Sequence, residues 1–199
     1  MFIQTEETPN PTTLKFLPGM VVKADGTLEA CDEAEAAASP LAQTLLSIDG
    51  VSRVLLGYDF ISVTKSADLE WKLLKPRIVA AIMDYFVTAP ISSETPPDAT
   101  SPHAAPLGPD DEDFDIVKQI CDILDSKVRP GLARDGGDIA FVKYQDGIVW
   151  LRLKGACAGC PSSTLTLKAG VENLLCSYVP EIVEVREAED DRDPDSLQP

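Results

Sequence analysis

The stretch Cys157-Ala158-Gly159-Cys160-Pro161-Ser162-Ser163 places two thiols three positions apart in one short loop. A β-rich run over residues 148–153 precedes it. A helix is predicted to follow from Ser162, because Pro161 suits a first helical turn. The free N–H groups and the positive dipole end of that helix would point at the sulfurs and favour thiolate, the form that binds metal. The stretch therefore predicts a thiol site at a strand-to-helix junction.

The segments around this loop predict a small α+β domain over residues 113–186. An apolar helical stripe comes first and ends at the turn Asp135-Gly136-Gly137-Asp138. Strands over residues 139–144 and 148–153 follow as a hairpin, and a short strand over 182–185 closes the domain. The helix after Ser162 is expected to bury Leu167, Val171, Leu174, Leu175 and Tyr178. The order is α-β-β-α-β.

Residues 1–88 predict a second small domain of mixed helices and strands. Strands are expected over residues 2–5 and 13–17, and a hairpin over 51–63. One helix begins at Ser39-Pro40, with the serine as its cap. Another runs from Asp68 to about Phe86, and Pro76 predicts a kink or break within it. Cys31 stands alone in an acidic, alanine-rich stretch and has no predicted role.

Residues 89–112 predict an acidic, proline-rich linker, and residues 187–199 an acidic, disordered tail. Six prolines lie within 89–109, among residues too small and polar to bury a core. Two small domains on such a linker are expected to move independently. The single histidine, His103, falls inside the linker, which argues against histidine-based catalysis and histidine-rich metal sites.

The charge balance excludes several classes of partner. With 17 basic and 33 acidic residues, the formal net charge is −16, so phosphate backbones and anionic lipid surfaces repel the chain. Nucleic acid and membranes are therefore not expected partners. The first residues resemble neither a secretory signal nor an Arg-rich transit peptide, and no apolar run is long enough to span a membrane. These features predict a cytoplasmic protein.

Counting ligands separates the chemistries that fit a pair of thiols. Structural zinc and iron–sulfur clusters usually take four protein ligands, and Cys157 and Cys160 supply two. Cys121 and Cys176 lie among apolar helical residues and are expected to be buried. Either the pair acts alone as a redox dithiol, or two chains share one metal centre in a symmetric homodimer. The domain is too short for a thioredoxin-like fold, which favours the shared centre.

The turn at residues 135–138, the hairpin and the Cys157–Ser163 stretch together resemble the NifU C-terminal domain of Nfu-type iron–sulfur proteins. The N-terminal domain of that family is resembled by Gln4-Thr5-Glu6 with Thr8-Pro9-Asn10-Pro11, and by Leu14-Lys15-Phe16-Leu17-Pro18-Gly19. The resemblance implies a non-enzymatic scaffold or carrier that holds a [4Fe-4S] cluster between two protomers and delivers it to apo-proteins. It also implies that Cys157 and Cys160 are the cluster ligands. A dithiol oxidoreductase and a zinc-stabilised dimerisation module remain the alternatives.

Overall fold

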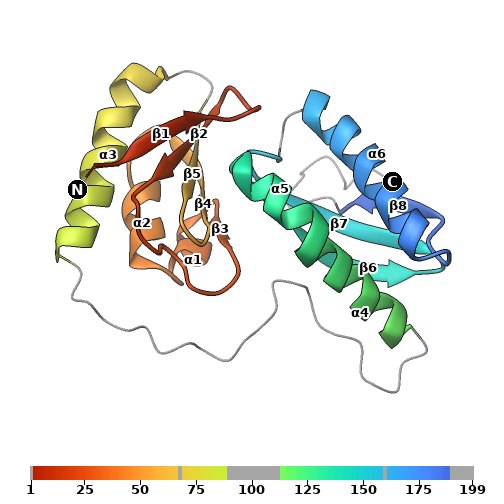
Figure 1. Ribbon diagram of the computed structural model, residues 1–199. Helices are drawn as coiled ribbons and strands as arrows, with labels where there is room; N and C mark the ends of the chain where they lie inside the picture. The colour runs from red at the N-terminus through yellow and green to blue at the C-terminus, as the bar shows by residue number, and fades with distance from the viewer. Residues whose placement is uncertain (1, 67–68, 89–112, 159–160, 189–199) are drawn as a thin grey trace, which may run out of the picture.

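The computed structural model describes residues 2–66, 69–88, 113–158 and 161–188 (Figure 1). The predicted linker, with His103, and nearly all of the predicted tail lie outside these residues. So do Asp68, the expected start of a helix, and Cys160, one of the two expected ligands. The described residues form two α+β units, each with its own buried apolar cluster.

The N-terminal unit is built on a five-stranded antiparallel sheet in the order β1-β2-β5-β4-β3. Its strands are β1 (Gln4–Glu7), β2 (Thr13–Leu17), β3 (Leu28–Ala30), β4 (Val51–Leu56) and β5 (Ile61–Lys65). The predicted hairpin is confirmed as β4 and β5, whereas β3 had no prediction. Because side chains alternate along a strand, Phe16, Ile61 and Val63 point to one face and are buried there.

Helices cover that buried face: α1 (Glu33–Ala36), α2 (Pro40–Leu46) and α3 (Trp71–Thr88). In Figure 1, α2 and α3 lie on the side of the sheet turned away from the C-terminal unit. Ser39 caps α2 as predicted, with its hydroxyl accepting from the Ala42 N–H at 3.4 Å. Of the predicted kink or break at Pro76, the break does not occur, because α3 continues through the proline. Leu74, Ile78 and Ile82 are buried on both sides of the proline, so packing outweighs the lost hydrogen bond.

The C-terminal unit follows the predicted α-β-β-α-β order. Its elements are α4 (Phe114–Ile123), a π-helical turn η1 (Leu124–Val128), α5 (Arg129–Arg134), β6 (Gly137–Gln145), β7 (Ile148–Gly155), α6 (Pro161–Tyr178) and β8 (Glu184–Glu187). The sheet order is β6-β7-β8, with β6 antiparallel and β8 parallel to β7. Strands β7 and β8 with the intervening α6 therefore form a βαβ unit, and the Cys157 loop begins at the carboxyl end of β7.

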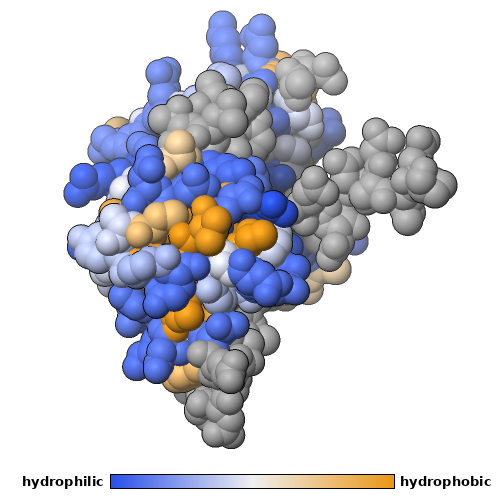
Figure 2. Space-filling model, turned by 90° about the vertical axis from the view of Figure 1, so that its right-hand side faces the viewer, coloured by the Kyte–Doolittle hydropathy of each residue, from blue (hydrophilic) through white to orange (hydrophobic). Residues whose placement is uncertain are grey.

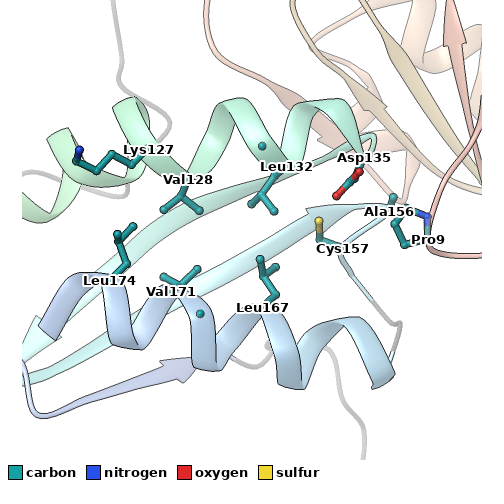
Figure 3. Close-up of a pocket in the computed structure, with 12 residues that line it drawn as sticks. Pro9, Lys127, Val128, Leu132, Asp135, Ala156, Cys157, Leu167, Val171 and Leu174 are labelled. Carbon is teal, nitrogen blue, oxygen red and sulfur yellow. The ribbon is translucent and has the colours of Figure 1, made fainter. Parts of the chain in front are cut away.

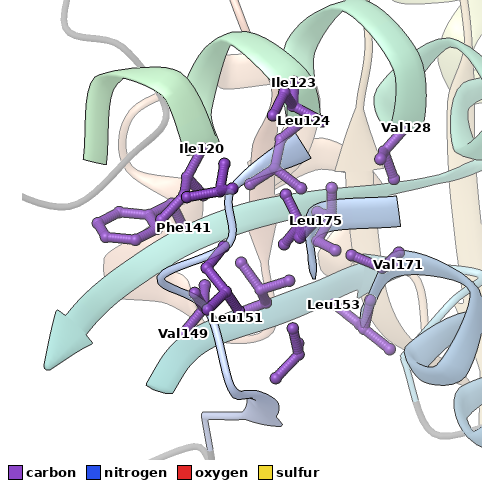
Figure 4. Packing of buried hydrophobic residues seen from close by; sticks show 14 of the residues in the cluster. Ile120, Ile123, Leu124, Val128, Phe141, Val149, Leu151, Leu153, Val171 and Leu175 are labelled. Atoms are coloured by element: carbon purple, nitrogen blue, oxygen red, sulfur yellow. The ribbon is translucent and has the colours of Figure 1, made fainter. Parts of the chain in front are cut away.

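The core of this unit lies between the sheet and its helices (Figure 4). Ile120 and Leu124 meet Phe141 and Val149 of the sheet, and Leu175 of α6 packs into the same cluster. The predicted burial of Tyr178 is wrong. Its side chain is 48% exposed and its ring packs under the Lys127 ammonium, 4.9 Å from the centroid.

Figure 2 shows apolar patches among hydrophilic residues on the coloured part of one face of the molecule. None of the described helices combines the length and apolar character that a membrane crossing needs.

Candidate functional site

Cys157 lies in the tight turn that leaves β7. Its N–H donates to the Lys154 carbonyl at 3.3 Å, and the Ala158 N–H donates to the Gly155 carbonyl at 3.2 Å. Gly155 has φ +60, a left-handed conformation that a residue with a Cβ rarely adopts. The turn fixes the position of the Cys157 backbone, while Cys160 lies beyond the described part of this loop.

The Cys157 thiol points inward. Its residue is only 7% exposed, and Figure 3 shows the sulfur directed into the space between α5 and α6. This space is a groove of about 630 Å³. Its apolar lining includes Val128, Leu132, Leu167, Val171 and Leu174. Pro9, from the N-terminal unit, lines the same groove. In this conformation the thiol is therefore sheltered from solvent.

The turn at residues 135–138 supports the thiol directly. A Cβ on Gly137 would lie 2.3 Å from the Cys157 sulfur and 3.0 Å from the Lys154 carbonyl oxygen, so only glycine fits there. The Gly136 carbonyl accepts from the Ala156 N–H at 3.1 Å. The turn ends α5, as predicted, and it also forms one wall of the thiol site, which the sequence interpretation missed.

Asp138 anchors this turn to α5. Its carboxylate, 3% exposed, accepts from Arg129 through both oxygens, at 2.7 and 2.8 Å. Arg129 also donates to Asp125 at 2.9 Å. Burial opposes the positive charge, but the bonds to these two carboxylates hold the pKa of Arg129 above its usual value. The ion pair fixes the start of β6 beside the thiol loop.

The other cysteines have different surroundings. Burial, with the nearby charges of Asp125 and Asp122, raises the pKa of Cys121 to about 12, so its thiol stays protonated near neutral pH. Cys176 packs against the apolar cluster, and Cys31 follows β3; both are half-buried. Within residues 2–66, 69–88, 113–158 and 161–188, no three histidine, cysteine or acidic side chains are grouped as a metal site would require.

The N-terminal unit contacts the thiol loop, contrary to the prediction that the two domains move independently. Asn10 donates to the Ala158 carbonyl at 3.2 Å, and Ser62 donates to the Gly136 carbonyl at 2.6 Å. The Glu29 carboxylate accepts from the Gly155 N–H at 2.8 Å. No sequence pattern indicated this contact, because polar residues alternating with apolar ones are typical of a solvent-facing side of a sheet.

Glu29 makes this contact sensitive to pH. Burial raises its pKa above 4.5, although the bond from Gly155 and the charges of Arg53 and Lys154 oppose the shift. The stability that Glu29 contributes is therefore fully present below about pH 4.5 and is lost as the pH rises through the raised pKa.

The variant Glu29→Gln cannot titrate at this position. The thermal midpoint of the variant minus that of the unchanged protein should therefore increase as the pH rises from about 4.5 through the raised pKa of Glu29. Thermal denaturation of both proteins from pH 4 to 8 measures this; a constant difference would contradict it.

Comparisons with known proteins agree with both halves of the fold. Residues 3–89 match the family model described as scaffold protein Nfu/NifU N terminal, and residues 120–186 match the NifU-like domain. The human "NFU1 iron-sulfur cluster scaffold homolog, mitochondrial" is 44% identical over 193 residues, which cover 96% of this chain and 73% of the human protein. The Arabidopsis thaliana "NifU-like protein 4, mitochondrial" is 44% identical over 197 residues, covering 97% and 68% of the two chains.

These names correct the prediction of a cytoplasmic location. The relatives are mitochondrial proteins, so that prediction is wrong, and they point to the mitochondrion instead. The physical reason is that an acidic surface and an ordinary globular composition suit a folded domain equally well in either compartment.

Proposed function

This chain belongs to the Nfu/NifU family of iron–sulfur cluster scaffold proteins, and from that membership we propose that it carries a [4Fe-4S] cluster as cargo between two copies of itself. Cys157 and Cys160 of each copy supply the four thiolates. The chain then delivers the cluster to apo-proteins, without making or breaking substrate bonds as an enzyme does. Like the relatives named above, it acts in the mitochondrion.

The observation that carries this proposal is the position of Cys157 at the end of β7. Its paired thiol, Cys160, follows three residues later, directly before α6 begins at Pro161. Four thiolates are the usual ligand set of a cubane cluster, and one chain offers two in this motif. Burial raises the pKa of Cys121 to about 12, which disfavours the thiolate that a cluster ligand must supply.

A cluster held between copies can be both bound and released. While the dimer persists, four sulfurs hold the iron; when the copies separate, each retains two, and the thiolates of a client can replace them one at a time. The Arg129–Asp138 ion pair and Gly137 keep the base of the loop fixed through this exchange. The domain boundaries that we propose are 1–88, 89–112, 113–186 and 187–199.

The test is anaerobic reconstitution with iron and sulfide. We expect about two iron atoms per chain, a brown colour, and a dimer by size-exclusion chromatography with light scattering. About four iron atoms on a monomer would contradict the shared cluster. A colourless dimer with stoichiometric zinc would instead identify a zinc-stabilised module, and metal-free disulfide reductase activity would identify an oxidoreductase.

A further inference from the structure

The face of the N-terminal sheet opposite its helices is not left to solvent. Lys15, Leu55 and Ser62 point to this face from three neighbouring strands, and each is nearly or fully buried. Burying a polar side chain is unfavourable unless it gains a partner. The buried polar residues of the described chain are Asn10, Thr13, Lys15, Ser62 and Asp138. All but Thr13 form a hydrogen bond that crosses between the two units.

Four of the bonds between the units reach main-chain atoms, either of the Cys157 loop or of the end of α5 and the turn that follows it. Besides the bonds to Ala158, Gly136 and Gly155 described above, Lys15 donates to the Arg134 carbonyl at 3.0 Å. Between side chains, Thr27 donates to the Asp138 carboxylate at 2.5 Å. The N-terminal sheet therefore holds the backbone of the thiol loop and of the turn that supports it.

Two glycines permit this close approach. A Cβ on Gly136 would lie 2.7 Å from the Ser62 hydroxyl, and one on Gly155 would lie 2.5 Å from Leu55 Cδ2. Both glycines have positive φ, +76 and +60. The steric fit is as close as in a protein interior, which distinguishes the contact from a loose encounter of two surfaces.

We propose that the open face of the N-terminal sheet is a docking surface for the Cys157 loop of its own chain, and that Asn10, Glu29 and Ser62 hold the thiol in its sheltered position. The bond from Asn10 and the bond to Glu29 hold the backbone from Gly155 to Ala158 where it directs the sulfur into the groove. A backbone movement that carries the sulfur out of the groove breaks both bonds. Docking of the N-terminal unit therefore disfavours exposure of Cys157.

This inference assigns the N-terminal unit a role in controlling thiol access. A second chain or a client protein that approaches Cys157 must displace the N-terminal sheet from the loop. That last consequence rests on the proposed function, whereas the sheltering itself does not, so the two are tested separately.

The test uses the full apo-chain in a Cys160→Ser background, so that alkylation by iodoacetamide at Cys157 is measured alone by peptide mass spectrometry. Glu29→Ala removes one bond to the loop and should speed alkylation about fivefold. The triple variant Asn10→Ala, Glu29→Ala, Ser62→Ala should speed it further. Glu29→Gln, which keeps an acceptor oxygen for Gly155, should restore the slow rate.

Glu35→Ala is the matched control. Glu35 also accepts a backbone N–H, from Cys31 at 2.8 Å, but within the N-terminal unit. It should leave the Cys157 rate unchanged. Cys121, whose pKa is about 12, is the internal reference for global unfolding, and its rate should stay low in every variant.

An unchanged Cys157 rate in the triple variant would overturn the proposal. A rise in Cys121 alkylation would reveal that the triple variant unfolds. In that case the two single variants provide the test: equal Cys157 alkylation rates in Glu29→Ala and Glu29→Gln would overturn the proposal. In a separate arm, with Cys160 intact, Glu29→Ala should transfer its cluster to an apo-protein faster. If Glu29→Ala is alkylated faster at Cys157 but the protein never binds a cluster, the proposed sheltering is supported and the proposed function is contradicted.

Discussion

Cys157→Ser is expected to abolish cluster binding by the full chain. In a cluster shared by two copies, one substitution removes two of the four sulfurs, and a serine hydroxyl is too weakly acidic to replace a thiolate. Cys160→Ser should have the same effect for the same reason. Iron content and visible absorbance after anaerobic reconstitution measure the loss, and circular dichroism reports whether the fold persists.

Cys121→Ser is the matched control for these substitutions. It is the same chemical change at a thiol of the same domain, on α4, and its raised pKa of about 12 disfavours the thiolate form that binds iron. Cys31→Ser and Cys176→Ser should also retain the cluster. A folded Cys121→Ser protein without iron, or a Cys157→Ser protein with a full complement, would contradict the ligand assignment.

Gly137→Ala should damage the same site without touching a ligand. The added methyl would meet the Cys157 sulfur at 2.3 Å and the Lys154 carbonyl at 3.0 Å, so the thiol or the β6–β7 pairing must shift. Overpacking of this kind costs about 1–3 kcal/mol of unfolding free energy, and the displaced sulfur should also lower cluster occupancy. Urea denaturation of the apo-protein and iron analysis after reconstitution measure the two effects.

Gly131→Ala provides the comparison. Gly131 lies in α5, and a Cβ there meets nothing within 4 Å. Alanine at an unstrained helical position stabilises by about 0.4–1 kcal/mol, so this variant should be slightly more stable. If Gly137→Ala matched it in stability and iron content, the close packing of Gly137 on the thiol would be refuted.

The sequence predicted the features that depend on local patterning. The alternation over residues 51–63 and 139–153 gave both hairpins, and Ser39 with Pro40 gave the start of α2. The paired cysteines led to the proposed ligand site because few other residue patterns hold a soft metal. Strand β3 was missed because Leu28–Ala30 is too short for a pattern of period two to be recognised.

Other features depend on contacts between distant parts of the chain. Lys15 and Ser62 alternate with apolar neighbours, which indicates water on their side of the sheet, yet both are buried by residues more than 70 positions away. Gly136 and Gly137 indicate a turn, but the sequence does not show that a sulfur and a hydroxyl fill the space where their side chains would be. Pro76 indicates a kink or a break, and helix packing prevents the break.

Because β8 pairs in parallel with β7, the C-terminal sheet can be completed only after the N-terminal sheet during synthesis of the chain. The N-terminal sheet and its helices end by residue 88, so that unit can fold while the rest of the chain is still emerging. The C-terminal sheet must wait for residues 184–187, which are held against residues 148–151 across the whole of α6. Ser62 and Glu29, which bond to the turn and to the cysteine loop, therefore belong to the part of the chain that is synthesised first.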